Sequence, residues 1–260
     1  FSLRGELFRL TDDVADDERW RQTLQTYRVD DLWQVAEFRR YCRPFAPESS
    51  GAQPGLVIPF STDVTFGQNF FGWPHAGGDS SYDSSNFATK IRSVGVWFDN
   101  YNGRGLSTTP RVYLVPAGLD ILRSPVGNDL ATREFSVIDQ ALPVPFPLGG
   151  SDLSSGSWIP QNDSLNGPFF DLRRFSRFRA YHDAGFDVSQ MTADSRLIGR
   201  SVWNTRWVLI IPGGTFLANS NTGLDTFING QLVPGSTTNR DGNGIKDIKL
   251  FFQTYAYSGL

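Results

Sequence analysis

The segment Ser201 to Pro212, SVWNTRWVLIIP, decides the fold that we expect for this chain. Val208 to Ile211 are four consecutive β-branched or leucine residues, and Trp203 and Trp207 precede them. A short, β-rich apolar run that ends in proline is typical of a strand buried on both faces, or nearly so. A helix would need a longer run, and Pro212 would end it.

Two other stretches have the composition of strands that pair with this segment: Lys90 to Phe98, KIRSVGVWF, and Gly244 to Tyr257, GIKDIKLFFQTYAY. Shorter strands are expected at residues 111–118, 133–146 and 173–182. Long Gly-, Pro- and Ser-rich loops separate these strands, and no β–α–β alternation is present. Residues 56–260 are therefore predicted to form a mainly β domain, a jelly-roll-like antiparallel β-sandwich.

Residues 1–45 are expected to form a short helical lead-in that packs on this main domain. Acidic residues precede DERWRQTLQTYR, and acidic side chains favour a helix N-terminus. A second short helix is predicted from Asp30 to Tyr41, with Asp30 or Asp31 as its cap. Residues 46–56 have the composition of a linker, and a short helix is expected at residues 224–230.

Charge and hydropathy exclude two classes of partner. The net charge of -3 provides no basic field to hold a nucleic-acid backbone. No apolar segment approaches the roughly 20 residues that a membrane-spanning helix needs. The chain begins with Phe1, and we expect it to be a fragment or processed product of a larger protein that is secreted or displayed at the cell surface.

The most specific local pattern is a candidate metal loop in which oxygen-bearing groups occupy every second position. Its residues are Asn239, Asp241, Asn243, Ile245 and Asp247, with glycines between them. Such spacing directs several oxygens inward, and Ca²⁺ takes six to eight oxygen ligands. The loop resembles the first nine positions of an EF-hand-like calcium loop, in which Ile245 would offer its carbonyl; the twelfth position is Leu250. The alternative is a β-turn in which Asp-Gly and Asn-Gly supply positive φ. No cofactor is required, and Ca²⁺ is the one candidate.

A second candidate site is the polar loop from Trp73 to Phe87. It combines flat aromatic rings with planar polar groups, the residue types that bind sugars. The candidate ligand-binding residues are Trp73, His75, Asp79, Tyr82 and Asn86. The alternative is a solvated connection with a buried aromatic residue where the loop begins.

No catalytic signature is present, and we expect no enzyme. The chain has two histidines and one cysteine, and it contains no GxSxG, P-loop or GxGxxG motif that opens a helix. Twenty-one phenylalanines and seven tryptophans exceed what the strand faces require. Aromatic side chains dominate interface energetics. Phe70, Phe71, Phe251 and Phe252 are therefore candidates to face a neighbouring domain or subunit.

Three stretches resemble the closing β-sandwich of Tc-type insecticidal toxin A subunits and related giant bacterial proteins. They are Glu6-Leu-Phe, KIRSVGVWF at residues 90–98, and the ending GIKDIKLFFQTYAYSG. The resemblance implies an interaction platform and no enzymatic activity. The function predicted from the sequence is thus a non-catalytic module for protein–protein interaction, self-association or assembly within a larger bacterial protein. The alternative is a carbohydrate-binding module, with or without calcium.

Overall fold

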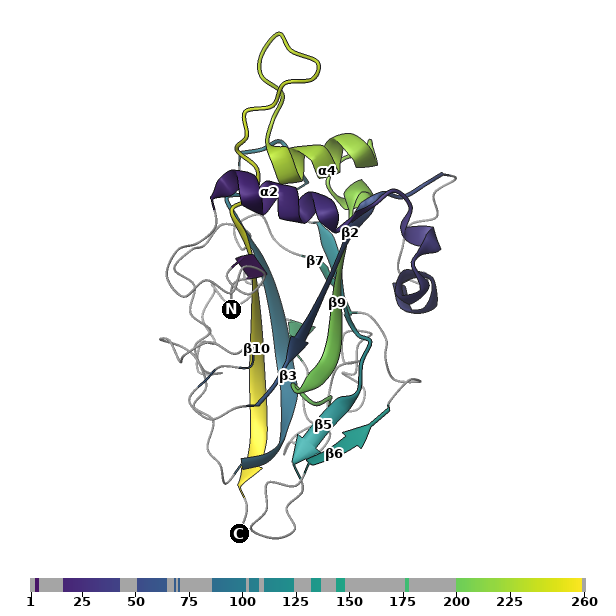
Figure 1. Cartoon of the computed structure of the whole chain (residues 1–260), viewed down its shortest axis with the longest axis vertical. Coiled ribbons are helices and arrows are strands. Elements are labelled where there is room, and N and C mark those ends of the chain that lie inside the picture. Colours follow the sequence, from purple (N-terminus) through teal and green to yellow (C-terminus); the bar gives the residue numbers. More distant parts are fainter. Residues whose placement is uncertain are drawn as a thin grey trace.

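The computed structural model describes residues 3–4, 16–42, 51–64, 68, 70, 86–101, 103–107, 110–123, 132–136, 144–147, 176–177 and 200–258. Most of the regular structure is antiparallel sheet, and helices are few (Figure 1), so the predicted mainly β class is confirmed. The strands are β1 (Arg28–Val29), β2 (Gly55–Thr62), β3 (Asn86–Asp99), β4 (Arg111–Pro116), β5 (Asp120–Arg123), β6 (Thr132–Phe135), β7 (Val144–Pro147), β8 (Ser176–Arg177), β9 (Asn204–Pro212) and β10 (Asp247–Ser258). The helical segments are α2 (Asp17–Thr26), α4 (Ser220–Asn229), the 3₁₀ turns η1 (Leu32–Gln34) and η7 (Gly213–Thr215), and the π-helical turn η2 (Phe38–Cys42).

Strand β9 occupies the middle of the larger, seven-stranded sheet, in which the order is β1-β2-β9-β4-β7. It pairs antiparallel with β2 and β4, and Leu209 faces Ile58 on one side and Leu114 on the other. Residues Trp207 to Pro212 are all buried. The prediction of a central strand buried on both faces is therefore confirmed.

The alternation of side chains along β9 places two hydrophobic cores on opposite faces of its sheet. Trp207, Leu209 and Ile211 belong to the larger core, together with residues of β2, β3, β4 and β10. Val208 and Ile210 belong to a smaller core that includes Leu32, Phe38 and Cys42 of the lead-in. A strand that is apolar on both sides needs such cover on both faces. The turns η1 and η2 supply the cover on the second face.

The expected pairing of residues 90–98 and 244–257 with β9 is wrong. Strands β3 and β10 pair with each other in a separate three-stranded sheet of order β10-β3-β8, in which Leu250 faces Val96. Among the described residues, their backbone pairing with the segment Ser201 to Pro212 is limited to the isolated bridge of Lys90 with Ser201. The reason lies in burial, because Ile248 and Leu250 of β10 are buried while Lys249 between them is partly exposed. A strand with one apolar face suits a sheet that has one face in the core.

The two sheets share the larger core, and the rings of Trp207 in β9 and Phe252 in β10 are 5.6 Å apart. Figure 1 shows β10 and β3 running beside β2 and β9, with α2 and α4 together at one end. The jelly-roll connectivity itself stays a prediction, because several connecting segments lie outside the described residues.

Other predicted elements differ in extent from the observed ones. The expected strand at 133–146 corresponds to β6 and β7, with 137–143 outside the described residues, and the strand expected at 173–182 is described only at β8. The helix expected at 224–230 is confirmed as α4, which begins earlier because the side chain of Asn219 caps it by accepting from Thr222 N. The expected helix from Asp30 to Tyr41 is instead the two short turns η1 and η2, and Asp31 caps η1.

Candidate interaction surface

A hairpin formed by Gln231 to Arg240, here called the docking hairpin, connects α4 to the turn that leads into β10. Figure 1 shows it projecting beyond α4 at the helical end of the molecule. An isolated antiparallel bridge joins Leu232 to Arg240, and the amide of Asp241 donates to the carbonyl oxygen of Gln231 at 2.9 Å. The base of the hairpin is thus closed by backbone contacts.

The tip of the hairpin is a tight turn from Val233 to Ser236. Pro234 and Gly235 occupy its central positions, and Gly235 has a φ of 82°. Proline followed by a residue with positive φ is the signature of a type II turn. The amide of Ser236 donates to the carbonyl of Val233 at 2.9 Å, and the Ser236 hydroxyl accepts from the amide of Asn239 at 2.8 Å. These hydrogen bonds define the conformation of the tip in the unbound chain.

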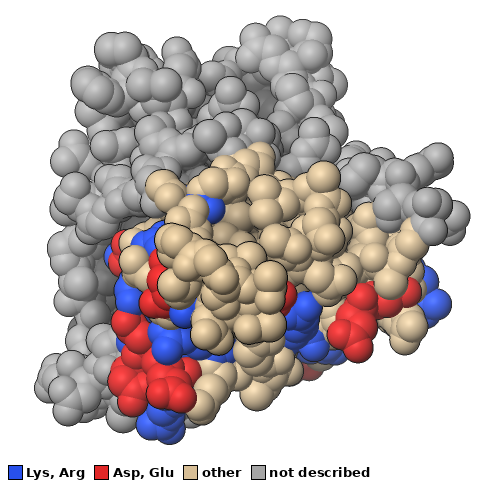
Figure 2. Space-filling model, turned by 90° about the horizontal axis from the view of Figure 1, so that it is seen from above, with Lys and Arg blue, Asp and Glu red and all other residues tan. Residues whose placement is uncertain are grey.

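The docking hairpin exposes apolar side chains and carries no charge before Arg240. Leu232 is 43% exposed and Val233 is 39% exposed. Residues 226–239 contain no acidic or basic side chain, although charged residues make up 20% of the chain. Seen from above in Figure 2, uncharged side chains cover the middle of the described surface, and acidic and basic ones gather to its sides. The cores of protein interfaces are depleted of charge in the same way.

The C-terminal end of α4 holds one side of the hairpin. The guanidinium of Arg240 donates to the carbonyl of Gly230 at 2.7 Å and to the hydroxyl of Thr226 at 3.1 Å. Gly230 has a φ of 86° and ends the helix by donating to the carbonyl of Thr226. The hairpin is therefore anchored to a helix whose Leu224, Phe227 and Ile228 lie in the larger core.

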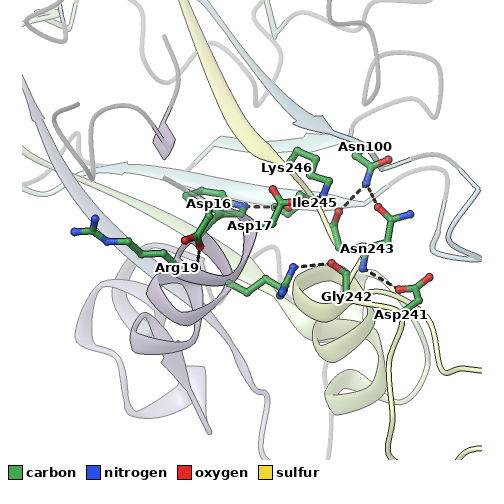
Figure 3. A network of polar contacts seen from close by, with 12 residues as sticks. Asp16, Asp17, Arg19, Asn100, Asp241, Gly242, Asn243, Ile245 and Lys246 are labelled. Carbon is green, nitrogen blue, oxygen red and sulfur yellow. Dashed lines mark hydrogen bonds and ion pairs between the residues drawn. The ribbon is translucent and has the colours of Figure 1, made fainter. Parts of the chain in front are cut away.

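The turn from Asp241 to Asp247, here called the root turn, holds the other side. The side chain of Asp241 accepts from the amide of Asn243 at 2.9 Å, and Gly242 has a φ of 69°. Asn100 donates to the side chain of Asn243 at 3.0 Å and to the carbonyl of Gly244 at 2.8 Å (Figure 3). The root turn thus has the Asp-Gly turn geometry that was the alternative to a metal loop.

Protein donors engage the oxygens that were predicted to bind calcium. The carbonyl of Ile245 accepts from the indole N–H of Trp20 at 2.9 Å. The buried carboxylate of Asp247 accepts from the amides of Arg4 and Ile248 at 3.0 and 2.7 Å. The side-chain oxygen of Asn243 accepts from Asn100 at 3.0 Å. Among the described residues no group of three or more His, Cys, Asp or Glu side chains could hold a metal ion. Calcium binding by this loop stays a prediction.

The candidate sugar-binding loop falls almost entirely outside the described residues. This applies to Trp73, His75, Asp79 and Tyr82, while Asn86 is the first residue of β3 and its side chain is not described. Of the aromatic residues proposed to face a partner, Phe70 and Phe252 are partly buried against the larger core. The side chains of Phe71 and Phe251 lie outside the described set. Sugar binding by this loop stays a prediction.

Two described carboxylates have a shifted pKa: Asp17, which contacts the root turn, and Asp120, which lies at the start of β5. A hydrogen bond from Lys246 lowers the pKa of Asp17, with Arg4 adding to the effect against partial burial. Burial raises the pKa of Asp120, although Arg200 and Asn204 oppose the rise. Asp120 lies at the start of β5, where it pairs with Arg200 at 3.2 Å and accepts from Asn204 at 2.7 Å. Both carboxylates are therefore held by cationic or amide partners within the fold.

The docking hairpin was not predicted from the sequence, which indicated no element between the helix expected at 224–230 and the candidate metal loop that begins at Asn239. The signal that identifies it is the combination of Leu-Val-Pro-Gly with a long uncharged run. Comparisons with protein-family models, with curated proteins and with solved structures found no match. In the part of the chain that the structure describes, no helix is long and apolar enough to cross a membrane. We therefore base the functional proposal on the contacts and the exposed side chains of the described residues.

Proposed function

We propose that this chain is a non-catalytic module for protein–protein interaction and assembly, which docks through the hairpin Gln231 to Arg240. The observation that carries the proposal is a hydrogen-bonded hairpin, without charged side chains before Arg240, that projects from the fold and exposes Leu232 and Val233. A rigid binding element loses little conformational entropy on association. Burial of exposed apolar side chains favours association, by about 25 cal/mol for each Å² of apolar surface removed from water. The resemblance to the closing domain of Tc-type toxin A subunits supports the same role, within a larger secreted or surface-displayed bacterial protein.

The partner to be tested first is a second copy of this chain, because self-association was one of the two sequence-based expectations, beside a different protein partner. Sedimentation equilibrium of the wild type should show a mass that rises with protein concentration. Leu232→Ser combined with Val233→Ser should raise the dissociation constant about tenfold or more, since tenfold corresponds to a loss of about 1.4 kcal/mol and burial of one such side chain contributes at least about that much. The free energy of unfolding should change by no more than about 0.5 kcal/mol, as for surface substitutions in general.

Leu119→Ser is the matched control, because Leu119 is 37% exposed and lies near β5 rather than on the hairpin. It should leave the dissociation constant unchanged. A strictly monomeric wild type, or a hairpin variant that associates as well as the wild type, would contradict docking through this surface. A large loss of stability in the hairpin variant would instead assign Leu232 and Val233 to the fold.

A further inference from the structure

In the contacts described, four residues of the lead-in contact the root turn: Arg4, Asp17, Trp20 and Arg21. Arg28 of β1 also connects to the hairpin indirectly, because Asp225 of α4 pairs with both Arg28 and Arg240. Trp20 of α2 donates its indole N–H to the carbonyl of Ile245 at 2.9 Å. Arg21, the next residue, donates its guanidinium to the carbonyl of Gly242 at 2.7 Å (Figure 3). Helix α2 therefore contacts both ends of the segment that runs from the hairpin into β10.

Arg4 makes further contacts with the root turn. Its backbone amide donates to the carboxylate of Asp247 at 3.0 Å, and its guanidinium donates to the carbonyl of Lys246 at 2.9 Å. The same guanidinium contacts Asp17 of α2 at 3.1 Å and lies 5.9 Å from the centre of the Trp20 ring. Lys246 of the root turn also forms an ion pair with Asp17. Arg4 is 8% exposed and Leu3 is fully buried, so this part of the lead-in is packed into the fold.

We infer that the lead-in is a clamp that regulates the docking hairpin, and that its contacts with the root turn keep the hairpin ordered for binding. The inference rests on the proposed docking function. The physical basis is that Asp241, the residue directly after the hairpin, closes it through the bond from its amide to Gln231, and that Gly242 is the next residue along the chain. When the clamp contacts are lost, the root turn has fewer restraints, and the hairpin spends more time open. If only the closed hairpin binds, the apparent affinity equals the intrinsic affinity multiplied by the fraction of chains whose hairpin is closed.

Residues outside the lead-in also contact the root turn, and their contacts limit how much the hairpin loosens when the lead-in contacts are lost. Asn100 binds Asn243 and Gly244, and Arg104 lies 3.8 Å from the carboxylate of Asp241. Loss of the lead-in contacts therefore weakens the hairpin without unfolding it. This graded response distinguishes a regulatory clamp from an element on which the whole fold depends, and it makes tension or displacement of the lead-in a route to control docking.

Hydrogen exchange of the hairpin amides in the full chain tests the clamp without a partner. Arg21→Ala removes the contact with Gly242 while leaving the buried Trp20 in place. Amides of residues 233–241 should exchange about three to ten times faster than in the wild type, as expected for loss of one charge-assisted hydrogen bond next to the segment. Amides of β9 should exchange at an unchanged rate. Gln25→Ala, at an exposed position on the same helix, is the control and should leave all these rates unchanged.

The clamp is overturned if the hairpin amides of Arg21→Ala exchange at the wild-type rate, or if Gln25→Ala accelerates them equally. Trp20→Phe provides a second measurement, since it deletes the indole N–H and retains an aromatic ring. It should accelerate the same amides. These rates are measured at concentrations where the chain is monomeric, so they report the clamp alone. Docking through Leu232 and Val233 can fail in sedimentation while the exchange result stands, and the reverse also holds.

Discussion

At the scale of single residues, the hydroxyl of Thr62 organises the polar groups that lie inside the apolar body. It accepts hydrogen bonds from the indole N–H of Trp207 at 2.8 Å and from the amide of Asn204 at 3.1 Å. It also donates to the carbonyl of Val202. All four residues are buried. One hydroxyl therefore satisfies three polar groups at the point where β9 begins.

Thr62→Val should lower the free energy of unfolding by about 1–3 kcal/mol, because the shape is kept while buried donors and an acceptor lose their partner. Denaturant unfolding measures the change. Ser61→Ala, at the exposed neighbouring position of β2, should alter stability by no more than about 0.5 kcal/mol. A Thr62→Val chain as stable as the wild type would show that these groups find other partners.

At the scale of elements, the end of α4 depends on Gly230, where the chain turns into the docking hairpin. A Cβ atom at this position would lie 1.9 Å from the carboxylate of Asp241 and 2.7 Å from the amide of Asn243. Gly235 at the tip of the hairpin also has a positive φ, but a Cβ there would meet nothing within 4 Å. The two glycines share a conformational requirement and differ in crowding.

Gly230→Ala should destabilise the chain by at least about 2 kcal/mol, since backbone strain adds to the displacement of the root turn. Gly235→Ala should cost about 1–2 kcal/mol from strain alone. Thermal or denaturant unfolding of the two variants compares these effects. Equal losses at both positions would mean that the contact between Gly230 and Asp241 contributes nothing.

The elements also show what the sequence can and cannot predict. The apolar run of β9 is compatible only with a strand that is covered on both faces. Its burial could therefore be predicted from Val208 to Ile211 alone. The strands that pair with β9 could not be predicted in this way, because the composition of β3 and β10 is typical of strands and fits either sheet. Choosing between them requires knowing that the lead-in covers Val208 and Ile210, a contact between residues far apart in the sequence. The short turns η1 and η2 differ from the predicted helix for the same reason, since burial of Leu32 and Phe38 overrides the local period.

The candidate site was predictable only in part. Asp-Gly and Asn-Gly in residues 241–244 indicate a turn, and the structure has one. Whether a turn of this kind binds a cation depends on which donors reach its oxygens. Trp20 and Arg4 reach Ile245 and Asp247 from across the chain, and no local pattern indicates these contacts. The docking hairpin carries a local signal, the uncharged run that ends at Asn239, but its projection from the fold depends on how α4 is anchored.

At the scale of the whole molecule, two sheets and the lead-in build a layered body with its helices at one end. Strand β9 lies between two cores, and α2 and α4 lie together near the root of the docking hairpin. The hairpin is thus a small exposed element on a large buried support. We propose that this support presents the hairpin to a protein partner.

Docking through the hairpin is tested by hydrogen exchange recorded below and above the concentration at which the chain associates. Amides of residues 231–240 should become slower to exchange on association, while those of β6, an exposed strand distant in sequence from the hairpin, should keep their rates. Protection that appears at β6 and not in the hairpin, or no change in any amide at the highest concentration, would contradict it.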